Sequence, residues 1–470
     1  FRWFERDTQK FRVLKGLDDL AEVEERISRH APGVLRGGVS YVTMFSGGAA
    51  ESSFTASRMT PERQTIRFDF LEMLALFILN LGAMFRIIGL SVVELASEFW
   101  DEVSARMGGR MRRKSFAFPL VRIFSNVVLR ELSTIMAVVD LFRGVPSIWI
   151  NYFGYDELAH HRGPVSLRAR LALRGIDTQI RKIHKAAGRA WPGGYDIYIL
   201  SDHGQVPTVP FDTLYRTTFD DYLSGAILEN RVRPLKWNGD EPRITRALSF
   251  INQLKSWEPS LGPWIRALAG ALTRRLEHGI SDVVTEKEAR EIGSVYVMPT
   301  SDMAHLYFND RPERHTVEEL EREHPGAIAS IIGHPGVQIC AGISADGVKV
   351  FTKKGVSILN PVTGAAIKGP DPFDGFDAVP WLGPSLMRLL AQKNCGDLLV
   401  FARRLGLRVV NFQSELGGHG GLYVEEQTAF IVAPAQVAAA RRGGVDLDRI
   451  DRAADLYPLF RSYSTGREQP

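Results

Sequence analysis

Two apolar segments of this chain are each followed directly by a carboxylate and a histidine. SIWINYF leads into GYDELAHH, which contains Asp156 and His160, and YDIYILS leads into Asp202 and His203. Short runs rich in β-branched and aromatic residues are typical of strands. Open α/β sheets bind ligands at the carboxyl ends of their strands. The pattern therefore predicts an α/β core with a polar site at one edge of its sheet.

The spacing within these segments favours metal ligation. Asp156 and His160 are four residues apart, so one helical turn places them on the same face. A carboxylate oxygen and an imidazole nitrogen there can both reach a divalent cation at about 2.0–2.2 Å. Asp202 and His203 are adjacent, and we expect Gly204 to let the backbone turn away beneath them. Both pairs are candidate metal ligands.

A fifth candidate ligand is His419, which lies in the glycine-rich run GGHGG. Backbone freedom there lets a loop bring one imidazole close to a metal held elsewhere. A mixed set of histidine and aspartate ligands suits zinc, while manganese would tolerate the same set. Any one of the three motifs is a weak signal, but their combination in one chain predicts a metal centre.

The rest of the chain fits a large α/β protein. With 470 residues, 45% of them hydrophobic, it can bury an extensive core. Strands alternate with helices from Pro146 onward, including a helix over 166–189, which indicates a mostly parallel sheet. We divide the chain into an N-terminal part of the core (1–66), an amphipathic helical insertion (67–114), a core with the metal motifs (115–213), a second helical insertion (214–291) and a C-terminal half with a tail (292–470).

The segment 69–101 has an amphipathic helical pattern, and basic residues cluster just after it, between 106 and 114. Its apolar run is shorter than the ~20 residues that a membrane-spanning helix needs. We expect residues 69–114 either to lie on an anionic membrane surface or to form a helical hairpin packed on its own domain or on a partner.

Charge and cysteine content limit the classes of partner and site that the sequence predicts. Basic and acidic residues nearly balance, 58 against 54, without a basic stripe, so we expect no nucleic acid polymer as a partner. Cys340 and Cys395 stand alone and are predicted to be buried hydrophobes. We interpret His305, His334 and Asp397 as structural residues of strands and turns.

In order and spacing, GYDELAHHRGP, LSDHGQ and GGHGG resemble the metal-ligand motifs of the alkaline phosphatase superfamily, closest to its nucleotide pyrophosphatase/phosphodiesterase branch. The resemblance runs from about residue 146 to 434 without the second insertion. It implies an α/β/α sandwich with two zinc ions. Asp156, His160 and His419 would bind one ion, and Asp202 and His203 would bind the other with an upstream aspartate and a nucleophilic threonine or serine. A looser likeness to bacterial membrane-associated members implies membrane association of the intact protein.

One part of the family pattern is not found. No hydroxyl between residues 38 and 58 follows an aspartate that ends a strand; the candidates Thr43, Ser46, Ser52, Ser53 and Thr55 are interpreted as structural. We therefore expect the nucleophile upstream of Phe1, and little activity from this chain alone.

The leading hypothesis is a metal-dependent phosphoric ester hydrolase of the phosphodiesterase or nucleotide pyrophosphatase type, acting on a phosphate-ester substrate. A phosphoglycerate mutase-like phosphotransferase and a non-catalytic membrane-associated scaffold with a degenerate site are the alternatives.

Overall fold

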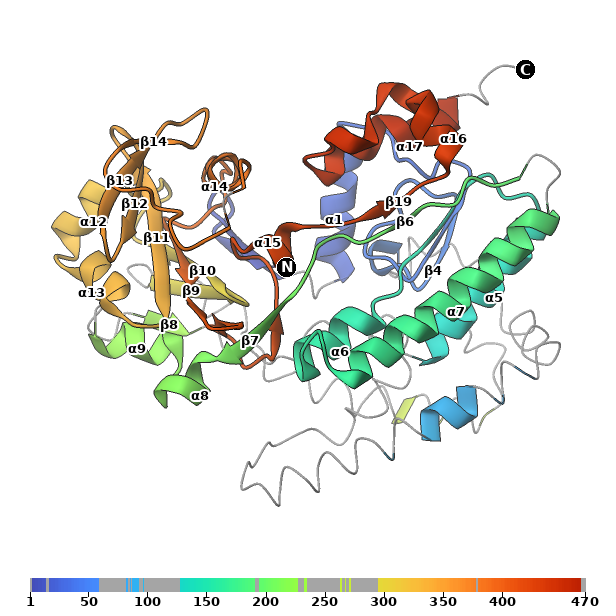
Figure 1. Cartoon of the computed structure of the whole chain (residues 1–470), viewed down its shortest axis with the longest axis horizontal. Coiled ribbons are helices and arrows are strands. Elements are labelled where there is room, and N and C mark those ends of the chain that lie inside the picture. The colour runs from blue at the N-terminus through green and yellow to red at the C-terminus, as the bar shows by residue number, and fades with distance from the viewer. Residues whose placement is uncertain are drawn as a thin grey trace.

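The computed structural model describes residues 2–13, 17–58, 127–190, 194–226, 232–234, 295–377 and 379–465, with short helical stretches between 82 and 96 and between 263 and 271. These residues form a mixed α/β fold. An eight-stranded sheet lies on one side of the molecule, and a three-stranded sheet flanked by long helices lies on the other (Figure 1).

The eight-stranded sheet has the order β14-β13-β12-β11-β15-β10-β9-β8. Its neighbouring strands are antiparallel except for the edge pair β8 and β9. The strands are β8 (Val232–Pro234), β9 (Val295–Thr300), β10 (Met303–Phe308), β11 (Val337–Ser344), β12 (Gly347–Thr352), β13 (Gly355–Leu359), β14 (Ala366–Lys368) and β15 (Leu398–Ala402).

Helices cover both faces of this sheet. Because successive side chains of a strand point to opposite faces, Val400 packs with Ile331 on one side and Leu399 packs with Leu386 on the other. The first face carries α8 (Phe211–Tyr215), α9 (Phe219–Ala226), α12 (Val317–Glu323) and α13 (Ala327–Gly333), and the second carries α14 (Leu382–Leu390).

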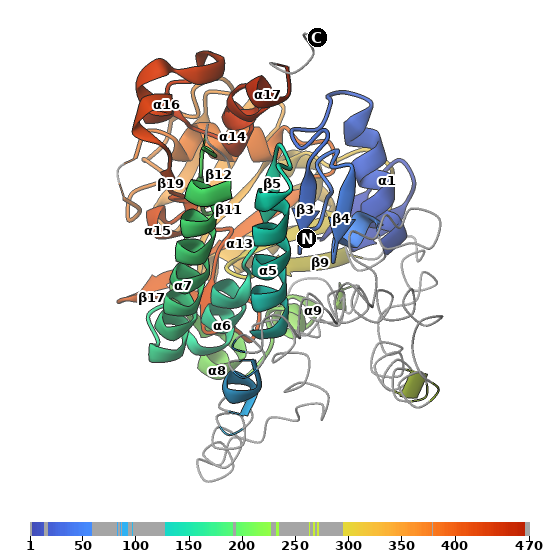
Figure 2. The ribbon, with the colours of Figure 1, turned by 90° about the vertical axis from the view of Figure 1, so that its right-hand side faces the viewer.

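The smaller sheet is parallel, with the order β4-β3-β5. Its central strand β3 contributes Tyr41, which is fully buried and packs with Met136 of α5. Figure 2 shows α5 and α7 side by side next to β5. The elements of this half are α1 (Leu17–Ser28), β3 (Val39–Tyr41), β4 (Glu51–Ser53), α5 (Leu129–Phe142), β5 (Ile148–Ile150), α6 (Gly154–Arg162) and α7 (Leu167–Ala190).

Short strands run between the two halves, as Figure 1 shows for β6, β7 and β19. β7 pairs in parallel with β17 and antiparallel with β18, while β19 pairs with β6. Their bounds are β6 (Ile199–Leu200), β7 (Val206–Pro210), β16 (Arg404–Leu405), β17 (Arg408–Asn411), β18 (Gly417–Gly418) and β19 (Ile431–Val432), and the C-terminal helices are α15 (Val424–Gln427), α16 (Ala435–Ala440) and α17 (Tyr457–Thr465).

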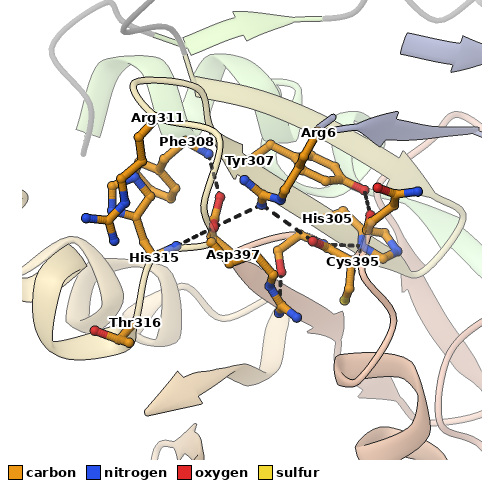
Figure 3. A network of polar contacts seen from close by, with 12 residues as sticks. Arg6, His305, Tyr307, Phe308, Arg311, His315, Thr316, Cys395 and Asp397 are labelled. Atoms are coloured by element: carbon orange, nitrogen blue, oxygen red, sulfur yellow. Dashed lines mark hydrogen bonds and ion pairs between the residues drawn. The ribbon is translucent and has the colours of Figure 1, made fainter. Parts of the chain in front are cut away.

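An N-terminal hairpin, β1 (Arg2–Glu5) and β2 (Lys10–Val13), docks on the large sheet. Its Phe4 packs against Tyr296 and Tyr307. Arg6 forms a buried ion pair of 2.9 Å with Asp397, which also accepts hydrogen bonds from two backbone N–H groups (Figure 3). Asp397 is thus buried and ties the N-terminal hairpin to the large sheet. Its interpretation from the sequence as a turn residue did not indicate this role.

The mixed α/β class is confirmed, but the largest sheet is not mostly parallel as expected. The physical reason lies in its connections. Only two residues separate β9 from β10, β11 from β12, and β12 from β13. Parallel neighbours need a crossover of a dozen or more residues, so connections this short require hairpins. Among the described strands, parallel pairing occurs in the small sheet, between β8 and β9, and between β7 and β17.

The helix expected over 166–189 is confirmed as α7. The proposed insertion 67–114 lies outside the described residues except for helical positions between 82 and 96, and most of 214–291 lies outside them too. Within the second insertion, α9 is helical but β8 is a strand. In the described part of the chain, no helix has the length and apolar character needed to cross a membrane. Membrane association stays a prediction.

Candidate metal centre

Helix α6 presents the first two candidate ligands. It begins just after β5, and its first turn contains Asp156, where the positive end of the helix dipole favours a carboxylate. One turn later comes His160, whose Nε2 lies 3.3 Å from Asp156 Oδ1. The helical spacing predicted from the sequence therefore brings these two side chains together.

His419 reaches the same point from the other end of the chain. The loop carrying it follows β18, which packs against α6 so closely that a Cβ on Gly417 would lie 2.4 Å from Ala159 O. Gly420 has a φ of +106°, which side chains rarely adopt, so the expected backbone freedom is used there. His419 Nε2 lies 3.1 Å from His160 Nε2 and 3.8 Å from Asp156 Oδ1.

These three atoms fit a bound cation. In a triangle with sides of 3.1, 3.3 and 3.8 Å, one central point lies about 2.0 Å from each corner, which matches Zn–N and Zn–O bonds of about 2.0–2.2 Å. A metal ion could therefore contact all three residues without rearrangement of the side chains. Three protein ligands of this mixed kind are typical of catalytic zinc sites.

His203 joins this group. Its ring stacks on that of His419 with centroids 3.6 Å apart. Ligand atoms of Asp156, His203 and His419 all lie within 4.8 Å of one another. His203 therefore lies where a second ion could share the centre.

Asp202 lies at the edge of the cluster, with its Oδ2 3.5 Å from His203 Nε2. Its side chain is 83% exposed, and its Oδ1 accepts a hydrogen bond from the backbone N–H of His203. Adjacency in the sequence placed Asp202 near the site, but its carboxylate is engaged in a local turn of the kind that aspartate favours.

Gly204 has a different role from the one expected. Its φ is not positive, so no special turn conformation requires glycine. Instead, a Cβ at this position would lie 1.9 Å from Glu425 O. Its N–H donates to Glu426 O. Glycine is needed here because two backbones touch.

Burial and neighbouring charges shift the pKa values of the cluster's ionisable groups in opposite directions. Burial disfavours the charged form of Asp156, but the neighbouring imidazoles, His160 above all, outweigh this effect and lower its pKa. Burial likewise opposes a charge on His160, yet Glu415 and Asp156 hold its pKa well above the usual value. Burial and the charge of His160 lower the pKa of His419 to about 3. His419 is therefore neutral at physiological pH, so one of its ring nitrogens carries a lone pair that could bind a metal.

Two further residues contact the cluster and were not identified from the sequence. Gln205 Nε2 donates to Asp156 Oδ1 at 3.4 Å. Glu415 Oε2 lies 3.1 Å from His160 Nδ1. Gln205 follows the DHG motif directly, and Glu415 precedes His419 by four residues. These positions next to the motifs were the only signal that the sequence offered.

Three of the five hydroxyls considered as nucleophiles form hydrogen bonds within the N-terminal part of the chain. Thr43 Oγ1 lies 3.0 Å from Thr55 Oγ1, and Ser46 Oγ donates to Glu24 Oε1. Ser52 and Ser53 are buried. The structural interpretation of these hydroxyls stays a prediction.

Other histidines have local structural roles. His305 Nδ1 accepts the N–H of Gly396, and burial lowers the pKa of His305 to about 4. His334 Nδ1 accepts the N–H of Gly336. His315 lies between Asp310 and Glu323, but these carboxylates approach different ring nitrogens, at 2.5 and 3.6 Å. These contacts are those of an imidazole bridging two carboxylates, and one ligand atom from each of the three residues also lies within 4.8 Å of the others.

Comparison with protein-family models, with curated proteins and with solved structures finds no match for this chain.

Proposed function

We propose that this chain carries the metal centre of a phosphoric ester hydrolase of the phosphodiesterase or nucleotide pyrophosphatase type. The observation that carries the proposal is the convergence of Asp156 Oδ1, His160 Nε2 and His419 Nε2 around a point about 2.0 Å from each. The order of the three motifs, which resembles that of the alkaline phosphatase superfamily, supports the same reaction class.

In this proposal Asp156, His160 and His419 hold one zinc ion, and His203 holds a second with Asp202. Asp202 is exposed and can turn toward His203, whose Nε2 lies 3.5 Å from Asp202 Oδ2. Two such ions supply charge neutralisation at the attacking and leaving oxygens of a phosphate ester. In this proposal the nucleophile and one further carboxylate are not among the described residues that meet at Asp156, His160 and His419. The α/β/α sandwich that the resemblance implies belongs to the same proposal.

The test compares zinc content and turnover. Wild-type chain dialysed against zinc is expected to retain the metal by elemental analysis, and Asp156→Asn is expected to weaken zinc binding at least ~10-fold because a charged ligand is lost. Asp177→Asn, an exposed carboxylate paired with Arg181 on α7, is the control. An unchanged zinc content in Asp156→Asn would refute the assignment.

A version extended upstream is assayed in parallel with bis-p-nitrophenyl phosphate. Hydrolysis that needs both the extension and zinc would support the phosphodiesterase. Transfer of phosphate back to a substrate hydroxyl would indicate the phosphotransferase, and zinc binding without turnover would indicate the scaffold.

A further inference from the structure

Glu415 is a buried carboxylate fixed beside the candidate metal centre. Its side chain is 10% exposed. Its carbonyl oxygen accepts a hydrogen bond from Thr208 Oγ1 at 2.8 Å. The next residue, Leu416, donates its backbone N–H to His160 O, also at 2.8 Å. The segment before β18 is thus tied to β7 on one side and to α6 on the other, and this limits where the carboxylate can lie.

From this position Glu415 acts on one nitrogen of His160. Gly417 O lies 2.9 Å from His160 Nδ1, and Glu415 Oε2 lies 3.1 Å from the same nitrogen. A carbonyl and a carboxylate oxygen are both acceptors, so Nδ1 carries the hydrogen. The other nitrogen, Nε2, then faces Asp156 and His419.

Within the described part of the chain, His160 is the ion-pair partner of Glu415. The hydrogen bond from His160 Nδ1 goes to the closer Gly417 O, so Glu415 Oε2 contacts Nδ1 as an ion pair and has no hydrogen bond of its own from those residues. A buried carboxylate with so little compensation is unfavourable unless positive charge lies near it. A dication held by His160 would supply that charge.

We propose that Glu415 is the positioning residue of the metal centre: it holds His160 with its hydrogen on Nδ1, aims the Nε2 lone pair at the cation and strengthens His160 as a ligand. This inference rests on the proposed function, because it requires that the centre binds a metal. Carboxylates that contact a ligating histidine in this way commonly change metal affinity by about 10- to 100-fold.

The experiment measures zinc affinity by competition with a chromophoric chelator at fixed pH. Glu415→Gln keeps the size and an acceptor oxygen but removes the charge, and it is expected to weaken zinc binding about 10-fold. Glu415→Ala removes both and is expected to weaken it up to about 100-fold. Glu131→Gln is the matched control, since Glu131 is a buried carboxylate that accepts hydrogen bonds from Gln179 and Lys182, away from the metal ligands. It should keep wild-type affinity.

A second readout separates positioning from general stability. Nitrogen-15 chemical shifts of the zinc-loaded protein are expected to show His160 with zinc on Nε2 and hydrogen on Nδ1 in the wild type, and a mixture of states in Glu415→Gln. If Glu415→Ala does not fold, Glu415→Gln carries the test.

The outcomes distinguish the two proposals. A wild-type chain that binds no zinc overturns the proposed function itself. Zinc binding that is equal in wild type and Glu415→Gln, or that falls equally in Glu131→Gln, leaves the metal centre standing and rejects the role of Glu415.

Discussion

Two buried acidic residues, Asp302 and Glu426, lie next to Gly421, two residues after His419, where an added Cβ would come within 2.1 Å of Asp302 Oδ2 and 3.0 Å of Glu426 Oε1. Each is 1% exposed, and the N–H of Gly421 donates to Glu426 Oε2 at 2.7 Å. Burial raises the pKa of Asp302 to about 6. Burial and the neighbouring Asp302 raise the pKa of Glu426 well above its usual value. Two carboxyl groups this close cannot both ionise without cost, so they share a proton.

Because the carboxyl groups of Asp302 and Glu426 have raised pKa values, we expect the free energy of unfolding to fall as the pH rises. A raised pKa means that the folded state binds the proton more tightly than the unfolded state. The stabilisation is complete below the ordinary aspartate pKa of 3.8 and is lost as the pH passes through about 6. Across this window the free energy of unfolding is expected to fall by up to about 1.4 kcal/mol per pH unit for each proton.

Asp302→Asn tests this prediction, because the amide keeps the shape of the side chain but carries no charge. Urea unfolding between pH 4 and 7 should show a shallower decline for Asp302→Asn than for the wild type, while the exposed control Asp177→Asn should follow the wild type. Equal slopes for all three proteins would show that the buried pair does not titrate in this window.

At the scale of elements, the link between β6 and β7 carries His203 and packs directly on α15. Gly204 lies at the contact, where an added Cβ would come within 1.9 Å of Glu425 O and 2.8 Å of Thr428 O. Both are backbone atoms, so the clash cannot be relieved by rotating a side chain.

Gly204→Ala is therefore expected to push the two backbones apart, to lower the free energy of unfolding by about 1–3 kcal/mol, and to disturb the stacking of His203 on His419. Gly188→Ala on α7 is the matched control, since a Cβ there meets nothing within 4 Å. It should stabilise the helix by about 0.5–1 kcal/mol. Thermal unfolding measures both, and a Gly204→Ala variant as stable as the wild type would contradict the close contact.

The elements show what local sequence could and could not predict. α7 was predicted because its helical pattern is contained in its own residues. The pairing of Asp156 with His160 followed from helical spacing in the same way. Strand direction is not contained in a strand's own pattern, so the antiparallel sheet was missed, although the two-residue connection between β11 and β12 was visible in the sequence.

At the scale of the whole molecule, the candidate site is built from segments far apart in the chain. The GGHGG loop was a sequence signal for His419, but the contact of Glu415 with His160 spans 255 residues and depends on how β18 packs on α6. The placement of the exposed Asp202 carboxylate beside His203 likewise depends on its local turn. Motif residues could be predicted, whereas the residues that orient them follow from tertiary packing.

The central claim is that Asp156, His160 and His419 bind one metal ion. Its most direct test is anomalous X-ray diffraction at the zinc edge from crystals of this chain grown with zinc. We expect a peak about 2 Å from Asp156 Oδ1, His160 Nε2 and His419 Nε2, and its loss in Asp156→Asn. Zinc absent from this point, or bound instead between Asp310, His315 and Glu323, would contradict the account.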